Sequence, residues 1–512
     1  MALDPIDLQV VTGALRAACE EMGAALVRSA HSANIKERRD CSSGLFDAAG
    51  EMVMQAEHIP VHLGAMPAAV AAVLGEDHAQ GQPWILNDPF RGGTHLPDIT
   101  VVTPVLDGGE LLGFAANRAH HADVGARVPG SMPADSTTLD EEGVVIAPRV
   151  LDDAAIGELS GLMRQPAQRR ADLRAQLAAN RIGARRLVEL AQRLGTDALR
   201  EATAAVLDYA ERRTRACIAA LPDGLREARD VLEGIDGDIA LQLAATVDGD
   251  RLILDFGGSA EQDRGNLNCP LAVTRSAAYF AVRVLTDPDV PPSAGAYRPI
   301  EVRAPAGSLL NARALEGGPA PAVAGGNVET SSRVADLVLA AFGRALGQGT
   351  MNNVTLGSEA RVGGFTYYET LGGGQGACED ADGPSAVHVA MSNTLNTPVE
   401  ALELEFPLRV VRHAIRRGSG GAGRHRGGDG IVRELEARSA MSYALITERR
   451  RHAPPGADGG EPGARGRNLL NGDELPAKAT GELQRGDRLA IETPGGGGHG
   501  RSRPDAGDEA DD

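Results

Sequence analysis

Apolar residues at helical spacing mark the first element of the chain. Asp4 and Pro5 suit a helix start. After them, apolar residues recur at Val10, Val11, Leu15, Cys19, Met22 and Leu26. We therefore expect a helix from about residue 4 to residue 29. Helical patterning also covers residues 153–220, punctuated by Gly183, Gly195 and residues 221–224. Further helices are predicted over 274–285 and from around residue 330 to about residue 346.

Runs rich in apolar and β-branched residues predict strands between these helices. The clearest pair is 99–106 with 110–116, joined by Asp107, Gly108 and Gly109, which suit a hairpin turn. A second hairpin is predicted from 238–247 and 251–256 around Asp248 and Gly249. Other strands are expected at 52–56, 431–437 and 441–446.

These elements indicate a multidomain α+β fold with mixed sheets, a helical insert and a glycine-rich, strand-rich C-terminal half. A chain of 512 residues exceeds what one core usually organises. We expect an N-terminal region carrying the active site at 1–152 and a helical segment at 153–225. A C-terminal α+β domain at 226–502 and a disordered acidic tail at 503–512 would follow.

Composition narrows the classes of function. The net charge of −19 argues against binding nucleic acid through a general basic surface, and the 3% aromatic content gives little to stack bases on. The five cysteines form no Cys-x-x-Cys pair, which is typical of reduced cytosolic thiols. We expect a cytoplasmic protein with no signal peptide, because the N-terminus is acidic, and no membrane span.

Two neighbouring stretches carry the candidate chemistry. Residues 87–98 and 118–125 contain His95, His120 and His121 together with Asp88, Asp98 and Asp123. The predicted hairpin starts just after Asp98 and ends just before His120, so its two ends should bring these two residues and His95 together. Imidazole and carboxylate are the mixed ligands of zinc, manganese and non-haem iron. The alternative is that these side chains only cap turns and hydrogen-bond loop backbone.

Other polar and glycine-rich stretches are weaker candidates. His58 and His62 are second-choice site residues, since histidines there more often satisfy a helix start. Gly325 and Gly326 precede a helix, a geometry that binds anions, although plain capping by Thr330 or Ser331 explains the pattern equally well. Residues 372–376 match neither a P-loop nor a dinucleotide fingerprint. Residues 495–500 look like a flexible loop or one built for close backbone approach.

Six stretches together resemble a known family. Residues 87–100, 119–125, 129–133, 325–330, 369–374 and 396–400 are similar, in order, to the hydantoinase B/oxoprolinase family. The resemblance runs from about residue 4 to residue 501. The family includes the B component of ATP-dependent N-methylhydantoinase, the C-terminal half of 5-oxoprolinase and a subunit of acetone carboxylase.

The resemblance implies a metal and a partner. The acetone carboxylase subunit holds manganese through His, Asp and His, which would be His95, Asp98 and His120 in this chain. His121 is a rival for the third position, because neighbours on a strand face opposite ways. The metal would be manganese, zinc or iron. ATP would be bound by a hydantoinase A-type partner in a hetero-oligomer, which agrees with the missing P-loop. Ala126 departs from the family, where a second glycine is more usual.

The resemblance also implies a division of labour. The partner would phosphorylate the amide oxygen of a small cyclic amide, and this chain would deliver metal-activated water to the ring carbon. Asp123, His121 or Asp88 would act as general base or orient the water. Backbone N–H groups in the two glycine loops would bind phosphate or oxyanion; the residues concerned are Gly325, Gly326, Asn327, Gly373 and Gly374.

Two other functions stay open on the sequence. The chain could be a carboxylase subunit that adds activated bicarbonate to a ketone enolate at the same metal. It could also be a non-catalytic scaffold that only stabilises its ATPase partner.

Overall fold

The hairpin predicted to carry the site lies in an antiparallel sheet with strand order β2-β1-β5-β4-β3-β6. The computed structural model describes residues 4–57, 59–78, 81–314, 317–359 and 364–502. The strands of this sheet are β1 (Cys41–Asp47), β2 (Met52–Glu57), β3 (Trp84–Leu86), β4 (Asp98–Asp107), β5 (Glu110–His120) and β6 (Arg149–Val150). The predicted hairpin is confirmed as β4 and β5, which pair from Asp107 opposite Glu110 to Asp98 opposite His120.

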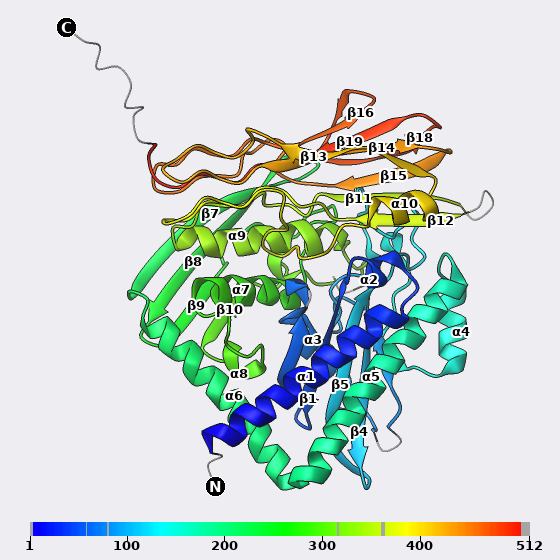
Figure 1. Cartoon of the computed structure of the whole chain (residues 1–512), viewed down its shortest axis with the longest axis vertical. Helices are drawn as coiled ribbons and strands as arrows, with labels where there is room; N and C mark the ends of the chain where they lie inside the picture. Colours follow the sequence, from blue (N-terminus) through cyan, green and yellow to red (C-terminus); the bar gives the residue numbers. More distant parts are fainter. Residues whose placement is uncertain (1–3, 58, 79–80, 315–316, 360–363, 503–512) are drawn as a thin grey trace.

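Long helices cover one face of this sheet (Figure 1). They are α1 (Pro5–Ser29), α5 (Pro166–Leu194) and α6 (Thr196–Ala219), with the shorter α4 (Asp153–Gly161) before α5. The predicted first helix is confirmed, and its Leu15 and Met22 share a core with Leu45 and Ala115 of the sheet. Gly183 does not interrupt the helical region. It lies inside α5 where α1 packs closely, since a Cβ at Gly183 would lie 2.3 Å from Met22 Sδ.

A second sheet and three helices lie on the other side of the first sheet. Its strands, in the order β10-β9-β8-β7, are β7 (Gly224–Glu233), β8 (Asp238–Asp248), β9 (Arg251–Asp255) and β10 (Ile300–Arg303). The largest core cluster joins this sheet to the first through α3 (Ala65–Ala71), α7 (Leu271–Leu285) and α9 (Ser331–Ala341). The hairpin β8–β9 and helix α7 are confirmed. Strand β7 was not predicted, and α9 ends before residue 346, because Gly343 takes a φ of +74°.

Two further antiparallel sheets form the C-terminal layers at the top of Figure 1. One has the order β12-β11-β15-β18 and the other β13-β14-β19-β16-β17, and they share an apolar core that includes Tyr367, Leu435 and Leu445. Their strands are β11 (Asn353–Ser358), β12 (Phe365–Glu369), β13 (Leu408–Arg416), β14 (Gly430–Ala437), β15 (Met441–Ile446), β16 (Arg467–Leu470), β17 (Asp473–Leu475), β18 (Lys478–Leu483) and β19 (Arg488–Glu492). The predicted strands at 431–437 and 441–446 are confirmed.

The late glycines serve close backbone packing. A Cβ at Gly496 would lie 2.0 Å from the carbonyl oxygen of Gln375, and one at Gly374 would lie 2.0 Å from that of Gly428. The prediction of close backbone approach at residues 495–500 is therefore confirmed. The remaining short elements are α2 (Ala33–Lys36), α8 (Ala294–Tyr297), α10 (Val399–Glu405), η1 (Pro60–His62), η2 (Leu139–Glu142), η3 (Leu309–Asn311) and η4 (Gly326–Thr330).

The α+β prediction with several sheets is confirmed. The domain boundaries at 152 and 225 stay predictions, and the predicted tail at 503–512 lies outside the described residues. None of the helices in the described ranges has the length and apolar character needed to cross a membrane.

Candidate metal centre

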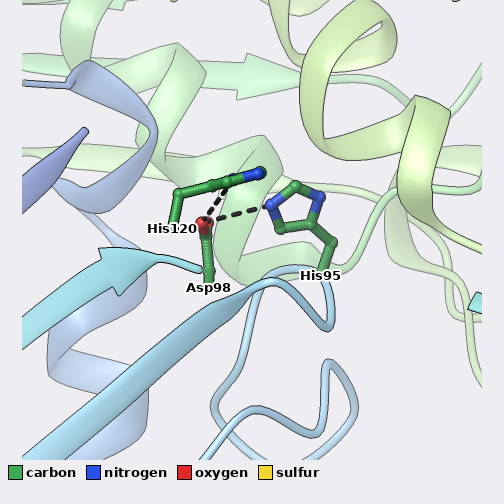
Figure 2. A group of neighbouring side chains, drawn as sticks. All are labelled: His95, Asp98 and His120. Carbon is green, nitrogen blue, oxygen red and sulfur yellow. Dashed lines mark ion pairs between the residues drawn. The ribbon is translucent and has the colours of Figure 1, made fainter. Parts of the chain in front are cut away.

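The open end of the β4–β5 hairpin brings three predicted ligands together. Asp98 begins β4, His120 ends β5, and the two are cross-strand partners. His95 comes from the loop before β4, where the backbone N–H of Asp98 donates to the carbonyl oxygen of His95 over 3.1 Å. Figure 2 shows both imidazoles turned toward the Asp98 carboxylate.

The distances in this group fit a shared cation. His95 Nε2 lies 3.1 Å and His120 Nδ1 lies 3.3 Å from Asp98 Oδ1. The possible ligand atoms of the three residues lie within 4.8 Å of one another, and all three side chains are buried. Two ligand atoms bound to one cation at about 2.1 Å are separated by about 3.0 to 3.4 Å in octahedral or tetrahedral geometry.

Orphaned nitrogen atoms are a second sign that the group suits a metal. Within the described part of the chain, both ring nitrogens of His95 and Nε2 of His120 have no hydrogen-bond partner. Buried polar atoms are nearly always hydrogen-bonded. His95 Nε2 is near Asp98 without hydrogen-bond geometry, which is the relation expected of two ligands to one ion. The residues present therefore fit a divalent metal.

The protonation states also fit. Burial alone would raise the pKa of Asp98, but the charge of His95 and the other imidazoles around it hold that pKa well below its ordinary value. Burial lowers the pKa of His120 to about 4. The centre thus offers a carboxylate and a neutral imidazole at neutral pH, which are the forms that bind metal. Thr94 Oγ1 donates to Asp98 Oδ2 over 2.7 Å and fixes the carboxylate.

Residues far away in sequence complete the wall of the centre. The ring of Tyr368 on β12 stacks on His120, with centroids 4.5 Å apart and an interplanar angle of 15°. The guanidinium of Arg38 lies 4.7 Å from the Tyr368 ring centroid and donates to the carbonyl oxygen of Tyr368 over 2.7 Å. Asp40 Oδ2 is 4.0 Å from His120 Nδ1, and burial, followed by the charge of Asp98, raises the pKa of Asp40 to about 7.

Sequence reasoning missed Arg38, Asp40 and Tyr368. Arg38 and Asp40 lie in a polar stretch whose residue spacing does not indicate a functional site. Tyr368 lies about 250 residues beyond His120. No sequence pattern could have indicated these residues, because only the packing of β12 against the end of the hairpin brings them to the centre.

A small cavity adjoins the centre. Its volume is about 20 Å³, and its lining includes Asp98, His120, Asn327, Tyr368 and Ser392. A volume of this size holds about one water molecule. The cavity therefore has room for one small species beside the ligands and none for a ring-shaped substrate.

His62, a second-choice candidate, lies beside the three ligands. Its Nε2 is 3.5 Å from Asp98 Oδ2, and its Nδ1 is hydrogen-bonded with Ser42 Oγ at 2.8 Å. It faces the carboxylate oxygen that does not approach His95 and His120. His58, the other second-choice residue, lies outside the described residues.

His121 is placed away from the three ligands. Its Nε2 is hydrogen-bonded with Gln176 Oε1 of α5 at 2.9 Å, and burial lowers its pKa to about 4. Neighbouring strand residues face opposite sides, so His120 rather than His121 joins His95 and Asp98. A catalytic role of His121 stays a prediction.

Asp123 and Asp88 stabilise loops by accepting hydrogen bonds from backbone N–H groups. Asp123 accepts hydrogen bonds from the N–H groups of Gly125 and Gly130, each over 2.8 Å, and pairs with Arg164 at 3.2 Å. Asp88 Oδ1 accepts from the N–H of Phe90 over 2.9 Å. These contacts are those of turn-forming residues, and the catalytic roles of both stay predictions.

The first glycine loop reaches the centre through Asn327. Gly325 and Gly326 lead into the π-helical turn η4, which continues as α9. The N–H of Gly326 donates to the carbonyl oxygen of Asn266 over 2.8 Å, whereas Asn327 lines the cavity beside Asp98. Simple capping of α9 is wrong, because the Thr330 hydroxyl donates to the Leu267 carbonyl oxygen instead.

The second glycine loop uses its N–H groups internally. Gly373 donates to the carbonyl oxygen of Val387 over 2.8 Å, and Gly374 donates to that of Pro494 over 3.1 Å. Both donors serve backbone packing in this structure. Anion binding by Gly373 and Gly374 stays a prediction.

Comparison with known proteins gives matches along nearly the whole chain. The profile of the family described as hydantoinase B/oxoprolinase matches residues 4–502. The chain is 38% identical to 5-oxoprolinase 1 of Arabidopsis thaliana, covering 97% of this chain and 42% of that protein. It is 31% identical to the B component of a D-/L-hydantoinase of Pseudomonas sp. strain NS671, covering 97% of this chain and 90% of that protein. The chain thus spans about two fifths of its 5-oxoprolinase relatives.

Two solved structures share the fold. The ATP-dependent caprolactamase of Pseudomonas jessenii matches with a TM-score of 0.90 and 29% identity, covering 99% of this chain and 93% of that chain. Nucleotide-free acetone carboxylase matches with a TM-score of 0.84 and 19% identity, covering 98% of this chain and 76% of that one. At this low identity, the second likeness shows the fold alone.

Proposed function

Because the chain belongs to the hydantoinase B/oxoprolinase family, we propose that it is the hydrolytic subunit of an ATP-dependent cyclic-amide hydrolase. The observation that carries the proposal is the convergence of His95, Asp98 and His120 at the end of one hairpin. The names of the relatives support the reaction type, since they include a 5-oxoprolinase, a hydantoinase component and an ATP-dependent caprolactamase.

We propose that His95, Asp98 and His120 hold one divalent cation, which is manganese, zinc or iron. When bound, such a cation activates water and polarises a carbonyl. Asp98 supplies the anionic oxygen and the two histidines supply ring nitrogens. Thr94 holds the second oxygen of Asp98, so that Oδ1 remains turned toward both imidazoles.

The other residues of the centre orient groups and limit water. Tyr368 keeps the His120 ring in one plane by stacking, and Arg38 holds Tyr368 through contacts with its ring and its carbonyl oxygen. Asn327 offers a side-chain amide to a substrate oxygen at the cavity, while Gly325 and Gly326 shape its turn. Phosphate binding by Gly373 and Gly374 would require their N–H groups to leave present partners.

The candidates for general base are Asp88, His121 and Asp123. The hydrogen bonds of Asp88 and Asp123 favour support of the loops around the centre over direct proton transfer, and that of His121 is made with Gln176 of α5. Asp123 holds the loop after β5 together by accepting hydrogen bonds from the N–H groups of Gly125 and Gly130.

The chemistry is divided between two subunits. A hydantoinase A-type partner would bind ATP and transfer its γ-phosphoryl group to the amide oxygen of a small cyclic amide. Water held at this centre would add to the ring carbon, the C–N bond would break with nitrogen leaving as an amine, and a second water would release phosphate. The complex would be a hetero-oligomer, and a cytoplasmic location stays a prediction.

An assay of the purified complex separates the possible functions. ATP hydrolysis that depends on hydantoin, 5-oxoproline or caprolactam supports the hydrolase. ATP hydrolysis that depends on a ketone with bicarbonate would instead identify a carboxylase. In either assay, His95→Ala should remove turnover, whereas His31→Ala, an exposed histidine, should not. Full turnover by His95→Ala would identify a scaffold.

A further inference from the structure

A cavity lies beside β2, the edge strand of the first sheet. Its volume is about 330 Å³, and we name it the edge cavity. Its lining includes Arg16 and Glu20 of α1, Gln55 and Ala56 of β2, and residues of the segment 288–292 after α7. No described residue lines both the edge cavity and the small cavity of the metal centre. The two spaces are therefore separate.

Gln55 is the buried polar residue of the edge cavity. It is 2% exposed, and neither its amide nitrogen nor its amide oxygen has a hydrogen-bond partner among the described residues. Buried polar atoms are nearly always hydrogen-bonded. A glutamine amide offers N–H donors and an acceptor oxygen next to each other. The edge cavity thus presents an unused donor and an unused acceptor side by side.

Two opposite charges line the same cavity from α1. Arg16 and Glu20 are four residues apart, a spacing that puts both side chains on one face of the helix. Both are exposed, and the structure gives neither side chain a hydrogen bond or an ion pair with any described residue. Opposite charges at this spacing can pair with each other. Here the cation and the anion both stay available to a ligand.

The wall formed by the segment 288–292 is held in place by Arg283 of α7, which also lines the cavity. Arg283 Nη1 donates to the Val290 carbonyl oxygen over 2.7 Å, and its Nη2 donates to that of Pro288 over 2.8 Å. These bonds fix the segment that carries Asp289, a second acidic residue of the lining. Because the guanidinium of Arg283 is used by the wall, Arg16 is the lining arginine that a ligand can engage.

These free groups match a ligand that carries both charges. A carboxylate would pair with Arg16 and accept from the Gln55 amide N–H, while an ammonium group would pair with Glu20 and donate to the amide oxygen. A plain carboxylate would leave Glu20 and the amide oxygen unused, and a plain amine would leave Arg16 and the amide N–H unused. The volume is at the lower end of the range of about 300–1,000 Å³ that small-molecule pockets show, which suits a molecule of amino-acid size.

We propose that the edge cavity binds a small α-amino acid, with its carboxylate toward Arg16 and its ammonium group toward Glu20. Binding here involves neither the metal ligands nor an amide that reacts, so the inference goes beyond the proposed function and does not rest on it. A bound amino acid would link α1, β2 and the segment after α7. It would therefore stabilise the folded chain in proportion to its concentration.

Calorimetry on the full chain tests the proposal, with L-alanine, L-glutamine and L-glutamate as probes. We expect at least one of them to bind with a Kd of about 1 mM or tighter. The analogues of that amino acid that lack one charge, which are propionate and ethylamine for L-alanine, should bind about tenfold more weakly or worse. Absence of binding by all three amino acids would overturn the proposal, as would a one-charge analogue that binds as tightly as its amino acid.

Variants of the lining give the second arm of the test. Gln55→Met keeps the length of the side chain but removes its donor and acceptor, so it should weaken amino-acid binding about tenfold or more. Arg16→Ala should have a similar effect, and it carries the test if Gln55→Met does not fold, because Arg16 is exposed. Arg28→Ala is the matched control, since Arg28 is exposed on the same helix and outside the cavity lining.

A metal-ligand variant separates the edge cavity from the metal centre. Amino acids can themselves bind a metal ion through nitrogen and oxygen, so binding is also measured with His95→Ala. We expect this variant to bind the amino acid as the wild type does. Binding that His95→Ala removes, or that Arg16→Ala leaves intact, would overturn the proposal.

Discussion

At the scale of single residues, the centre depends on where each ring and oxygen is held. His120 is fixed from three sides: by pairing with Asp98, by its backbone N–H on the Asp40 carbonyl oxygen, and by the Tyr368 ring. Orienting contacts of this kind on a metal-binding histidine tune metal affinity. The stacked ring is the contact that a substitution can remove without touching a ligand.

Replacing Tyr368 should weaken metal binding. An aromatic stack contributes about 0.5–1.5 kcal/mol, so Tyr368→Leu should raise the metal dissociation constant about two- to tenfold. Tyr368→Phe keeps the stack and should bind metal nearly as the wild type does. Tyr367→Leu is the control, because Tyr367 lies in the core of the C-terminal layers. Equal metal affinity in Tyr368→Leu, measured by calorimetry, would argue against an orienting role.

Gly326 shapes the turn that carries Asn327. A Cβ there would lie 1.8 Å from the carbonyl oxygen of Asn268, which is backbone and cannot move aside. Gly326→Ala should lower the free energy of unfolding by about 2 kcal/mol or more, as overpacking does. Gly13→Ala is the matched control in open space inside α1 and should raise it by about 0.5–1 kcal/mol. Denaturant unfolding gives both values, and a neutral Gly326→Ala would refute the close contact.

At the scale of elements, the hairpin made the site predictable. The turn residues Asp107–Gly109 and the two apolar runs fixed β4 and β5, and pairing then forced Asp98 opposite His120. The local pattern of apolar and polar residues was also enough to predict α1, α7 and the hairpin β8–β9. It did not suffice for β7, for the end of α9, or for Gly183, where packing against distant elements decides the structure.

Buried ion pairs join elements from both halves of the chain. Asp230 on β7 contacts Arg333 of α9 at 2.9 Å and Arg449, just beyond β15, at 2.6 Å. Burial opposes ionisation of Asp230, but the two guanidinium groups outweigh burial and lower its pKa. The network therefore stabilises the contact between β7, α9 and the C-terminal layers.

Asp230→Asn should destabilise the fold in a pH-dependent way. Loss of a buried charge partner should lower the free energy of unfolding by about 2–3 kcal/mol at pH 7. A lowered folded-state pKa gives stability that is present above the unfolded value and lost as pH falls through the folded one. The difference from wild type should thus shrink below the ordinary pKa of 3.8. A difference that stays constant down to pH 3 in denaturant titrations would contradict this assignment.

At the scale of the whole molecule, the C-terminal layers close the centre that the N-terminal sheet builds. Arg38 precedes β1, yet its Nη1 donates to the Tyr368 carbonyl oxygen over 2.7 Å and its Nη2 to Thr370 Oγ1 over 2.8 Å. No local pattern encodes contacts across more than 300 residues. The sequence therefore predicted that His95, Asp98 and His120 converge, but not which residues surround them.

Arg38→Ala should weaken the contact between the N-terminal sheet and the C-terminal layers. Breaking a buried hydrogen-bonded guanidinium should lower the free energy of unfolding by about 3 kcal/mol and weaken metal binding, because Tyr368 loses its support. Arg38→Lys should restore little, since an ammonium cannot reach two acceptors in a fixed fork. Arg39→Ala, at an exposed neighbour, is the control. Unchanged stability and metal affinity in Arg38→Ala would show that the layers close without this contact.

The metal content of the purified protein tests the central claim most directly. After purification from metal-supplemented cells, elemental analysis should give about one divalent ion per wild-type chain and almost none in His95→Ala, Asp98→Asn or His120→Ala. His31→Ala should keep the wild-type content. A wild-type chain without metal, or ligand variants that retain it in full, would contradict the account.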